Sequence, residues 1–141
     1  MEGWKATDTW ISQSRSLYAE WNTTVEQHSG PTTDVPPSYA HVIGAVNRVC
    51  DETDLALTAA GGFPGELCKN WKTKSSGTFD CEFGFSCMGY EIAGGWGAKM
   101  ADPDRDVIVF VGDGSYLMMN SDIYRILVKS LNFQPLFILC D

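Results

Sequence analysis

An unbroken apolar run at residues 107–111 leads directly into the turn sequence Gly-Asp-Gly at residues 112–114. Apolar residues in sequence without alternation are typical of a parallel strand that is buried on both faces of its sheet. A stretch with helical apolar spacing follows, and then a second apolar run at residues 136–139. Strand, helix and strand in this order predict a βαβ unit, and therefore an α/β fold with a mostly parallel sheet.

Capping residues and apolar periodicity predict the remaining elements. Helices are expected to begin after Thr7 or Asp8, after Ser38 and at Tyr90, and a strand is expected to begin at Leu55. The small residues Ala93, Gly94, Gly97 and Ala98 of the helix that begins at Tyr90 are expected to permit close packing against a sheet or a partner. The helix between the two apolar runs is expected to begin at residues 120–122 and to carry Ile123, Ile126, Leu127 and Leu131 at helical spacing. The connecting segments are expected to be glycine-rich loops at residues 59–65 and 83–89 and a polar surface excursion at residues 70–80.

Prolines divide the chain into two expected parts. Residues 1–37 read as an N-terminal helical segment followed by a Pro-rich linker, because the prolines between residues 31 and 37 block helix formation. Residues 38–141 read as a single α/β domain with helices on both faces of the sheet, a three-layer sandwich. Because the last apolar strand runs directly into Asp141, this sandwich is expected to be incomplete at its C-terminus.

Charge and hydropathy exclude several classes of protein. The chain carries 18 acidic and 10 basic residues and no basic cluster, which argues against a nucleic-acid partner. No run approaches the roughly 20 apolar residues of a membrane span, and the N-terminus lacks a signal pattern. We therefore expect a cytoplasmic protein with no membrane partner.

Cysteine and histidine spacing suggests neither a zinc site nor a disulfide framework. The five cysteines include no C-x-x-C pair, so free thiols are expected. A nucleophilic Cys87 is the alternative, but no histidine lies near it in the sequence. His28 and His41 are expected to lie on the surface or in helix packing.

Three glycine-rich segments, residues 59–65, 83–89 and 112–115, each lie at a predicted strand end or before a predicted helix. If they converge, backbone N–H groups from 61–65 and 114–115 can bind phosphate oxygens. Asp113 then supplies an oxygen ligand for a divalent cation such as Mg²⁺. The alternative for Gly-Asp-Gly taken alone is a purely structural turn.

Residues 112–115 and the following crossover to residues 139–141 resemble the diphosphate-binding motif of thiamine-diphosphate enzymes. Longer stretches, at residues 59–67, 79–94 and 112–122, resemble more narrowly the trihydroxycyclohexanedione hydrolases of myo-inositol catabolism. The resemblance extends over residues 31–141, and it implies the three-layer thiamine-diphosphate-binding fold.

The resemblance implies a role for each matching residue. Asp113 is the implied Mg²⁺ ligand, and the implied thiamine diphosphate contacts are Gly61, Phe63, Pro64, Gly65, Ser86, Met88, Gly112, Gly114 and Ser115. Met88 matches the residue that supports the bent cofactor, although a core-filling methionine is the alternative. Glu82 and Glu91 match no family catalytic residue, so structural roles are expected for them, or a substrate contact for Glu82.

The implied activity is that of a hydrolase cleaving a C–C bond of a cyclic 1,2-dione, with the cofactor as electron sink. The glutamate that activates the cofactor in this family has no match in the chain, so the catalytic residues are unknown and the isolated chain is expected to be inactive. The implied partners are a polyol-derived dione and further copies of the full-length protein. A thiamine-diphosphate carboligase or decarboxylase, or a catalytically silent binding or interaction module, are the alternatives.

Overall fold

The computed structural model describes residues 3–127 and 135–140, with side chains for all but residues 125–127. Its sheet has four strands, all parallel, in the order β2-β1-β3-β4. They are β1 (Leu55–Thr58), β2 (Phe79–Cys81), β3 (Val107–Gly112) and β4 (Leu136–Cys140). The prediction of an α/β fold with a mostly parallel sheet is therefore confirmed.

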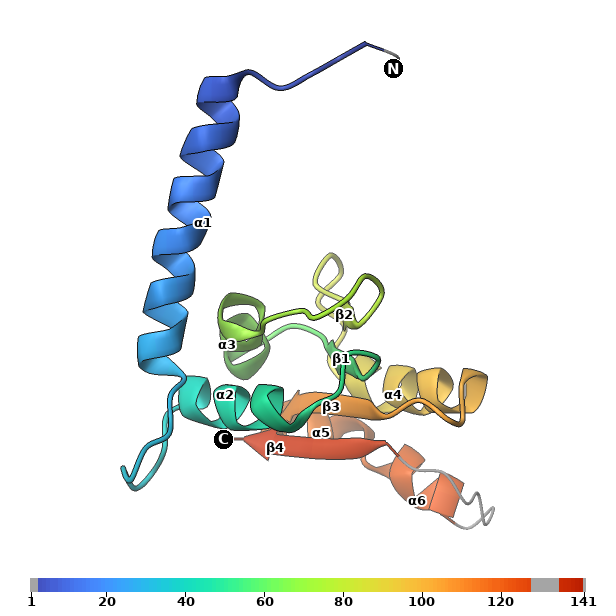
Figure 1. Ribbon diagram of the computed structural model, residues 1–141. Helices are drawn as coiled ribbons and strands as arrows, with labels where there is room; N and C mark the ends of the chain where they lie inside the picture. The colour runs from blue at the N-terminus through green and yellow to red at the C-terminus, as the bar shows by residue number, and fades with distance from the viewer. Residues whose placement is uncertain (1–2, 128–134, 141) are drawn as a thin grey trace.

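Six helices surround or extend this sheet in the described part of the chain (Figure 1). They are α1 (Asp8–His28), α2 (Tyr39–Val49), α3 (Gly62–Asn70), α4 (Tyr90–Ala101), α5 (Asp113–Met119) and α6 (Ser121–Leu127). Helices α2 and α3 pack on one face of the sheet, and α4 and α5 on the other. The three layers expected from the sequence are thus present.

Strand β3 is the centre of both cores because its side chains alternate between the two faces of the sheet. Ile108 and Phe110 face α2 and α3, where Phe110 lies edge-on to Phe63 at a ring-centroid distance of 5.7 Å. Val109 and Val111 face the opposite layer. All of these residues are buried, as predicted for an unbroken apolar strand.

The glycines of α4 bring this helix close to the sheet. The sequence favoured a packing face of Ala93, Gly94, Gly97 and Ala98, but Ala93 and Gly97 are exposed. The close approach is at Gly95 instead, where an added Cβ would lie 2.3 Å from Val109 Cγ2. The expected face was wrong by one or two positions, because composition alone does not fix helix rotation.

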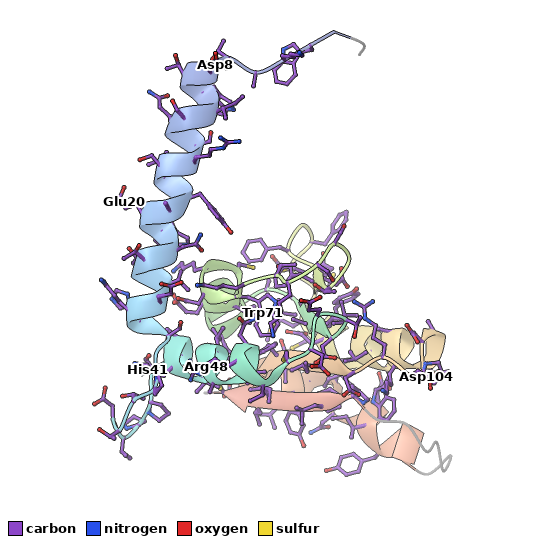
Figure 2. The ribbon with its side chains drawn as sticks, viewed as in Figure 1. Asp8, Glu20, His41, Arg48, Trp71 and Asp104 are labelled. Atoms are coloured by element: carbon purple, nitrogen blue, oxygen red, sulfur yellow. The ribbon has the colours of Figure 1, made fainter. Side chains whose placement is uncertain are left out.

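Helix α1 stands away from the rest of the molecule over most of its length (Figure 1). Thr7 caps it as predicted, accepting a hydrogen bond from the Trp10 N–H. Val25 is the single buried residue of the helix, and Figure 2 shows Glu20 pointing away from the sheet layers. At its end the Arg48 guanidinium of α2 donates to the Ser29 carbonyl at 2.7 Å.

Three expected loop assignments require correction. Residues 62–65 are helical rather than looped, since Pro64 lies in the first turn of α3, where a missing N–H costs no hydrogen bond. The excursion at residues 70–80 ends in strand β2, which is too short and too polar to show apolar alternation. The Gly-Asp-Gly turn is the junction of β3 and α5, because the helix begins at Asp113 itself.

Other expectations fall partly or wholly outside the described residues. Helix α6 begins at Ser121 as predicted, but the packing of Ile126, Leu127 and Leu131 lies beyond what the structure describes. The same holds for Asp141, the expected end of the diphosphate motif. None of the described helices is long and apolar enough to cross a membrane.

Candidate functional site

Three segments predicted to converge do meet at the carboxyl ends of the parallel strands. They enclose a cavity of about 190 Å³ between the end of β1, the start of α3 and the junction of β3 with α5. The predicted residues that line it are Gly61, Phe63, Pro64, Met88, Gly112, Asp113, Gly114 and Ser115. This edge of an open α/β sheet is where ligands generally bind.

One side of the cavity is part of the folded core, and we call residues 60–64 and 112–115 the core wall. Phe63 and Ser115 are each only 3% exposed. The Phe63 ring packs against Tyr39 at a centroid distance of 5.1 Å. Beneath the wall, the buried Thr58 hydroxyl donates to the Phe110 carbonyl at 2.9 Å and ties β1 to β3. The core wall is therefore positioned by the same contacts that stabilise the fold.

Asp113 is the acidic group of the core wall. It is exposed, and its Oδ1 accepts a hydrogen bond from the Gly114 N–H at 2.7 Å. Among the residues that the structure describes, no group of three or more His, Cys, Asp or Glu side chains could hold a metal ion. A lone carboxylate still suits Mg²⁺, which is often bound by one or two carboxylates together with phosphate oxygens and water.

The opposite side of the cavity is an exposed loop, and we call residues 82–89 the loop wall. The Glu82 carboxylate accepts hydrogen bonds from the Cys87 N–H at 2.7 Å and the Phe85 N–H at 2.8 Å. These two bonds lower the pKa of Glu82. Ser86, between the two donors, has a φ of 54°, which is uncommon for a residue with a side chain. A single carboxylate thus holds the curvature of this loop.

A second carboxylate holds the end of the loop wall. Glu91 Oε2, on the first turn of α4, accepts a hydrogen bond from the Gly89 N–H at 2.9 Å. Glu91 is completely buried, and in the described structure its Oε1 has no hydrogen-bond partner. The Tyr90 hydroxyl next to it donates to Asp80 on β2 at 2.6 Å, and this bond raises the pKa of Tyr90 to about 12.

The two walls come closest at Met88 and Gly114. A Cβ on residue 114 would lie 3.2 Å from the Met88 Cε, so glycine leaves the space between the walls open. Met88 is 47% exposed, which does not fit a core-filling methionine. The methionine side chain therefore faces a cavity that a larger residue at position 114 would narrow.

Two of the predicted site residues do not line this cavity, and four residues that do line it were not among the predicted contacts. Gly65 is the fourth residue of α3, and Ser86 lies on the loop wall without reaching the cavity. Tyr39, Ala60, Gly62 and Cys140 are the additional lining residues. Cys140 is the last residue of β4 and pairs with Gly112 in the parallel register of β3 and β4, so the pairing of these two strands could have placed Cys140 at the cavity. Tyr39 reaches the cavity only through tertiary packing.

Four larger cavities, of about 260 to 670 Å³, lie elsewhere on the described surface. One, of about 440 Å³, is lined by residues 75–78 and Arg105 and lies at the amino ends of the strands. Another, of about 670 Å³, lies between α1, α2 and α3 and includes Trp21 and Val25. The cavity of about 190 Å³ is the smallest of these, but it lies at the carboxyl ends of the strands, where ligands bind in open α/β sheets. Its position therefore favours it as the functional site.

Comparison with known proteins identifies the family to which the chain belongs. The family described as thiamine pyrophosphate enzyme, C-terminal TPP binding domain, matches residues 59–138, which include all three converging segments. Curated proteins named 3D-(3,5/4)-trihydroxycyclohexane-1,2-dione hydrolase are similar to the same region. The protein of that name from Geobacillus thermodenitrificans (strain NG80-2) is 48% identical over 82 residues, which are 58% of this chain and 13% of the relative.

A second protein of that name, from Clostridium botulinum (strain Alaska E43 / Type E3), is 42% identical over 91 residues, which are 64% of this chain and 14% of the relative. The matched region thus spans about one seventh of the length of these relatives. The resemblance inferred from the sequence motifs is confirmed. Because the family model covers more than half of its residues, the chain belongs to the thiamine pyrophosphate enzymes, within their C-terminal TPP-binding domain.

Proposed function

We propose that this chain supplies the diphosphate and metal side of the thiamine diphosphate site in a hydrolase that cleaves a C–C bond of trihydroxycyclohexane-1,2-dione. The observation that carries the proposal is the convergence of residues 60–64, Met88 and residues 112–115 on one cavity within the family-matched region. The names of the similar proteins supply the substrate class.

The donor set of the core wall suits a metal-bound diphosphate. Asp113 would hold Mg²⁺ through its carboxylate, while the Ser115 N–H would donate to a diphosphate oxygen. The Gly114 N–H would do the same by exchanging its present acceptor, Asp113 Oδ1, for a phosphate oxygen. The opening of α3 at Gly61 to Pro64 would border the phosphates from the other side. Exposure of Asp113 at the cavity leaves its second oxygen accessible to such a cation.

The loop wall would position the organic part of the cofactor. Met88 would lie under the bound rings, while its own N–H and the Ser86 carbonyl would face the aminopyrimidine edge. The left-handed backbone of Ser86 sets the direction of that carbonyl. Hydrogen bonds from the Phe85 and Cys87 N–H groups to the Glu82 carboxylate stabilise this conformation. Bound thiamine diphosphate supplies the electron sink that C–C cleavage next to a carbonyl requires.

The complete reaction is proposed for a longer protein. A cavity of about 190 Å³ is smaller than the roughly 300–1,000 Å³ of a whole cofactor site, so other elements would cover the remaining surface of the cofactor. In this family an activating glutamate comes from a separate domain of a second copy, and we propose a homo-oligomer on that basis. The cytoplasmic location expected from the sequence stays a prediction.

Calorimetric titration of thiamine diphosphate into the chain, with and without Mg²⁺, tests this proposal. We expect weak binding that depends on Mg²⁺ and that Asp113→Ala weakens by about tenfold or more, which corresponds to ~1.4 kcal/mol or more. The matched control is Asp104→Ala, which removes an exposed carboxylate from a turn on another part of the surface (Figure 2) and should change nothing.

Two results would contradict the proposal. Binding that is unchanged by Asp113→Ala would remove this carboxylate from the metal site. A folded chain that binds no thiamine diphosphate at millimolar concentration would favour a silent interaction module instead.

A further inference from the structure

Two cysteine thiols lie side by side next to the core wall. The Sγ atoms of Cys68, on α3, and Cys81, the last residue of β2, are 3.9 Å apart. Cys68 is exposed and Cys81 is half-buried. In the described part of the chain, no other two cysteines have their sulfur atoms within hydrogen-bonding distance. These thiols are 13 residues apart in sequence and are brought together by tertiary structure alone.

The pair is connected to the backbone of the cofactor cavity. The Cys81 thiol also donates to the Ala59 carbonyl at 3.5 Å, and Ala59 is the residue that leaves β1 toward the core wall. In the register of the sheet, Cys81 lies beside Thr58. Cys68 is on the same helix as Phe63 and Pro64, two residues of the cavity. A bond between the two sulfurs would therefore join the strand beside Ala59, where the 59–63 segment begins, to α3, where it ends.

We propose that Cys68 and Cys81 form an oxidation site that closes to an intramolecular disulfide in the presence of a peroxide. The exposed Cys68 thiol loses its proton, and the thiolate attacks the peroxide and becomes a sulfenic acid. The hydroxide that leaves takes up the proton lost from Cys68 and gives one water. The Cys81 sulfur then attacks the Cys68 sulfur, and the sulfenic oxygen leaves as a second water with the Cys81 proton. Two thiols and one hydrogen peroxide thus give one disulfide and two waters.

The order of attack follows from the surroundings of the two sulfurs. Burial, together with charge repulsion by Cys68 and the hydrogen bond between the two thiols, raises the pKa of Cys81 to about 12, so this thiol is protonated and unreactive at first. Cys68 is therefore oxidised first, and Cys81 reacts second, at the sulfur of the Cys68 sulfenic acid.

Closing the bond changes the wall of the cavity. The sulfur atoms must approach from 3.9 Å to about 2.05 Å, and the Cys81 hydrogen bond to the Ala59 carbonyl is lost. The side chains of Cys68 on α3 and Cys81 at the end of β2 must rotate or shift to allow this. In a consequence that rests on the proposed function, the oxidised chain should bind thiamine diphosphate with Mg²⁺ more weakly than the reduced chain, by several-fold.

Peptide mapping of the whole chain after brief treatment with one equivalent of hydrogen peroxide tests the oxidation site. After alkylation of free thiols, we expect a cross-linked pair of peptides that contains Cys68 and Cys81 and has lost two hydrogens. Dithiothreitol should restore both thiols. The control is Cys87, an exposed thiol with no cysteine partner in the described structure, which should be alkylated in the main product.

Phenylarsine oxide provides a second measurement that does not depend on oxidation, because a trivalent arsenical bridges two adjacent thiols. One equivalent should bind the untreated chain and protect Cys68 and Cys81 together from alkylation, and Cys68→Ser should abolish this protection. Disulfides that join Cys87 between chains, with Cys68 and Cys81 left alkylated, would overturn the proposal. Both measurements concern only the thiols, so their outcome does not depend on whether the chain binds thiamine diphosphate.

Discussion

The core wall and the loop wall border the same cavity but are stabilised by different forces. Phe63 and Ser115 in the core wall are almost completely buried, and β1 and β3 hold the segments on which they lie. In the loop wall, residues 83–88 are all exposed, and Phe85 is 91% exposed. Hydrogen bonds from backbone N–H groups to Glu82 and Glu91 give the loop its shape.

This difference indicates that stability and ligand positioning are divided between the two walls. Burial of apolar area contributes most of the free energy of folding, so the core wall cannot be altered without a loss of stability. Local hydrogen bonds to backbone N–H groups hold a conformation but contribute less to global stability. Substitutions in the loop wall should therefore affect cofactor binding more than unfolding.

The largest effect on stability is expected for Phe63→Ala in the core wall. The variant loses the aromatic contacts with Tyr39 and Phe110 and leaves a cavity, which should lower the free energy of unfolding by about 3–5 kcal/mol. Phe63→Leu is the matched control and should lose less than half of that amount. Denaturant titration followed by tryptophan fluorescence measures both, and equal losses in the two variants would argue against cavity formation as the cause.

An intermediate effect is expected for Glu91→Ala, at the end of the loop wall. The Gly89 N–H would lose its acceptor in a buried position, and the free energy of unfolding should fall by about 1–3 kcal/mol. Glu91→Gln keeps an acceptor oxygen and should fall by less. A Glu91→Ala protein that is more stable than the parent would show that the desolvation of the buried carboxylate outweighs its hydrogen bond.

The smallest effect on stability, with a clear effect on the loop, is expected for Glu82→Gln. An amide group can accept one backbone N–H where the carboxylate accepts two, so the backbone around Ser86 should relax. Thermal unfolding should hardly change, while the amide resonances of Phe85 and Cys87 should shift. Unchanged amide resonances in the variant would show that Glu82 does not hold this loop.

The pH dependence of the parent protein follows from the same carboxylate. The hydrogen bonds from Cys87 and Phe85 lower the folded-state pKa of Glu82 below the ordinary value of 4.5. The contribution of Glu82 is therefore fully present above pH 4.5 and is lost as the pH falls through the lowered folded-state value. The Phe85 and Cys87 amides should titrate together in that acidic range, and a transition near neutral pH would point to another group.

Much of the core wall could be predicted because its signals are local in sequence. The apolar run at residues 107–111 and the Gly-Asp-Gly that follows it place Asp113 at the end of a buried strand. Parallel strands present their carboxyl ends at one edge of the sheet, so the meeting of residues 59–65 with 112–115 followed from topology. The helix boundaries differ from the prediction, because α3 and α5 begin within the segments expected to be loops.

The loop wall and its surroundings depend on contacts that no local pattern reveals. Glu82 and Glu91 were expected to be structural, but their hydrogen bonds to particular backbone N–H groups follow only from the folded loop. Strand β2 has three residues and an exposed edge, so it shows no periodicity. The contact of Cys68 with Cys81 requires both β2 and α3 in place, and neither boundary was predicted.

If three segments distant in sequence form one cofactor site, their amide resonances should respond to the cofactor together. Addition of thiamine diphosphate with Mg²⁺ to the isotope-labelled chain should shift the amides of residues 61–63, Met88 and residues 112–115 together, with one common affinity. Shifts confined to the groove between α1, α2 and α3, or to residues 75–78 at the amino ends of the strands, would show that the cofactor does not bind where these three segments meet.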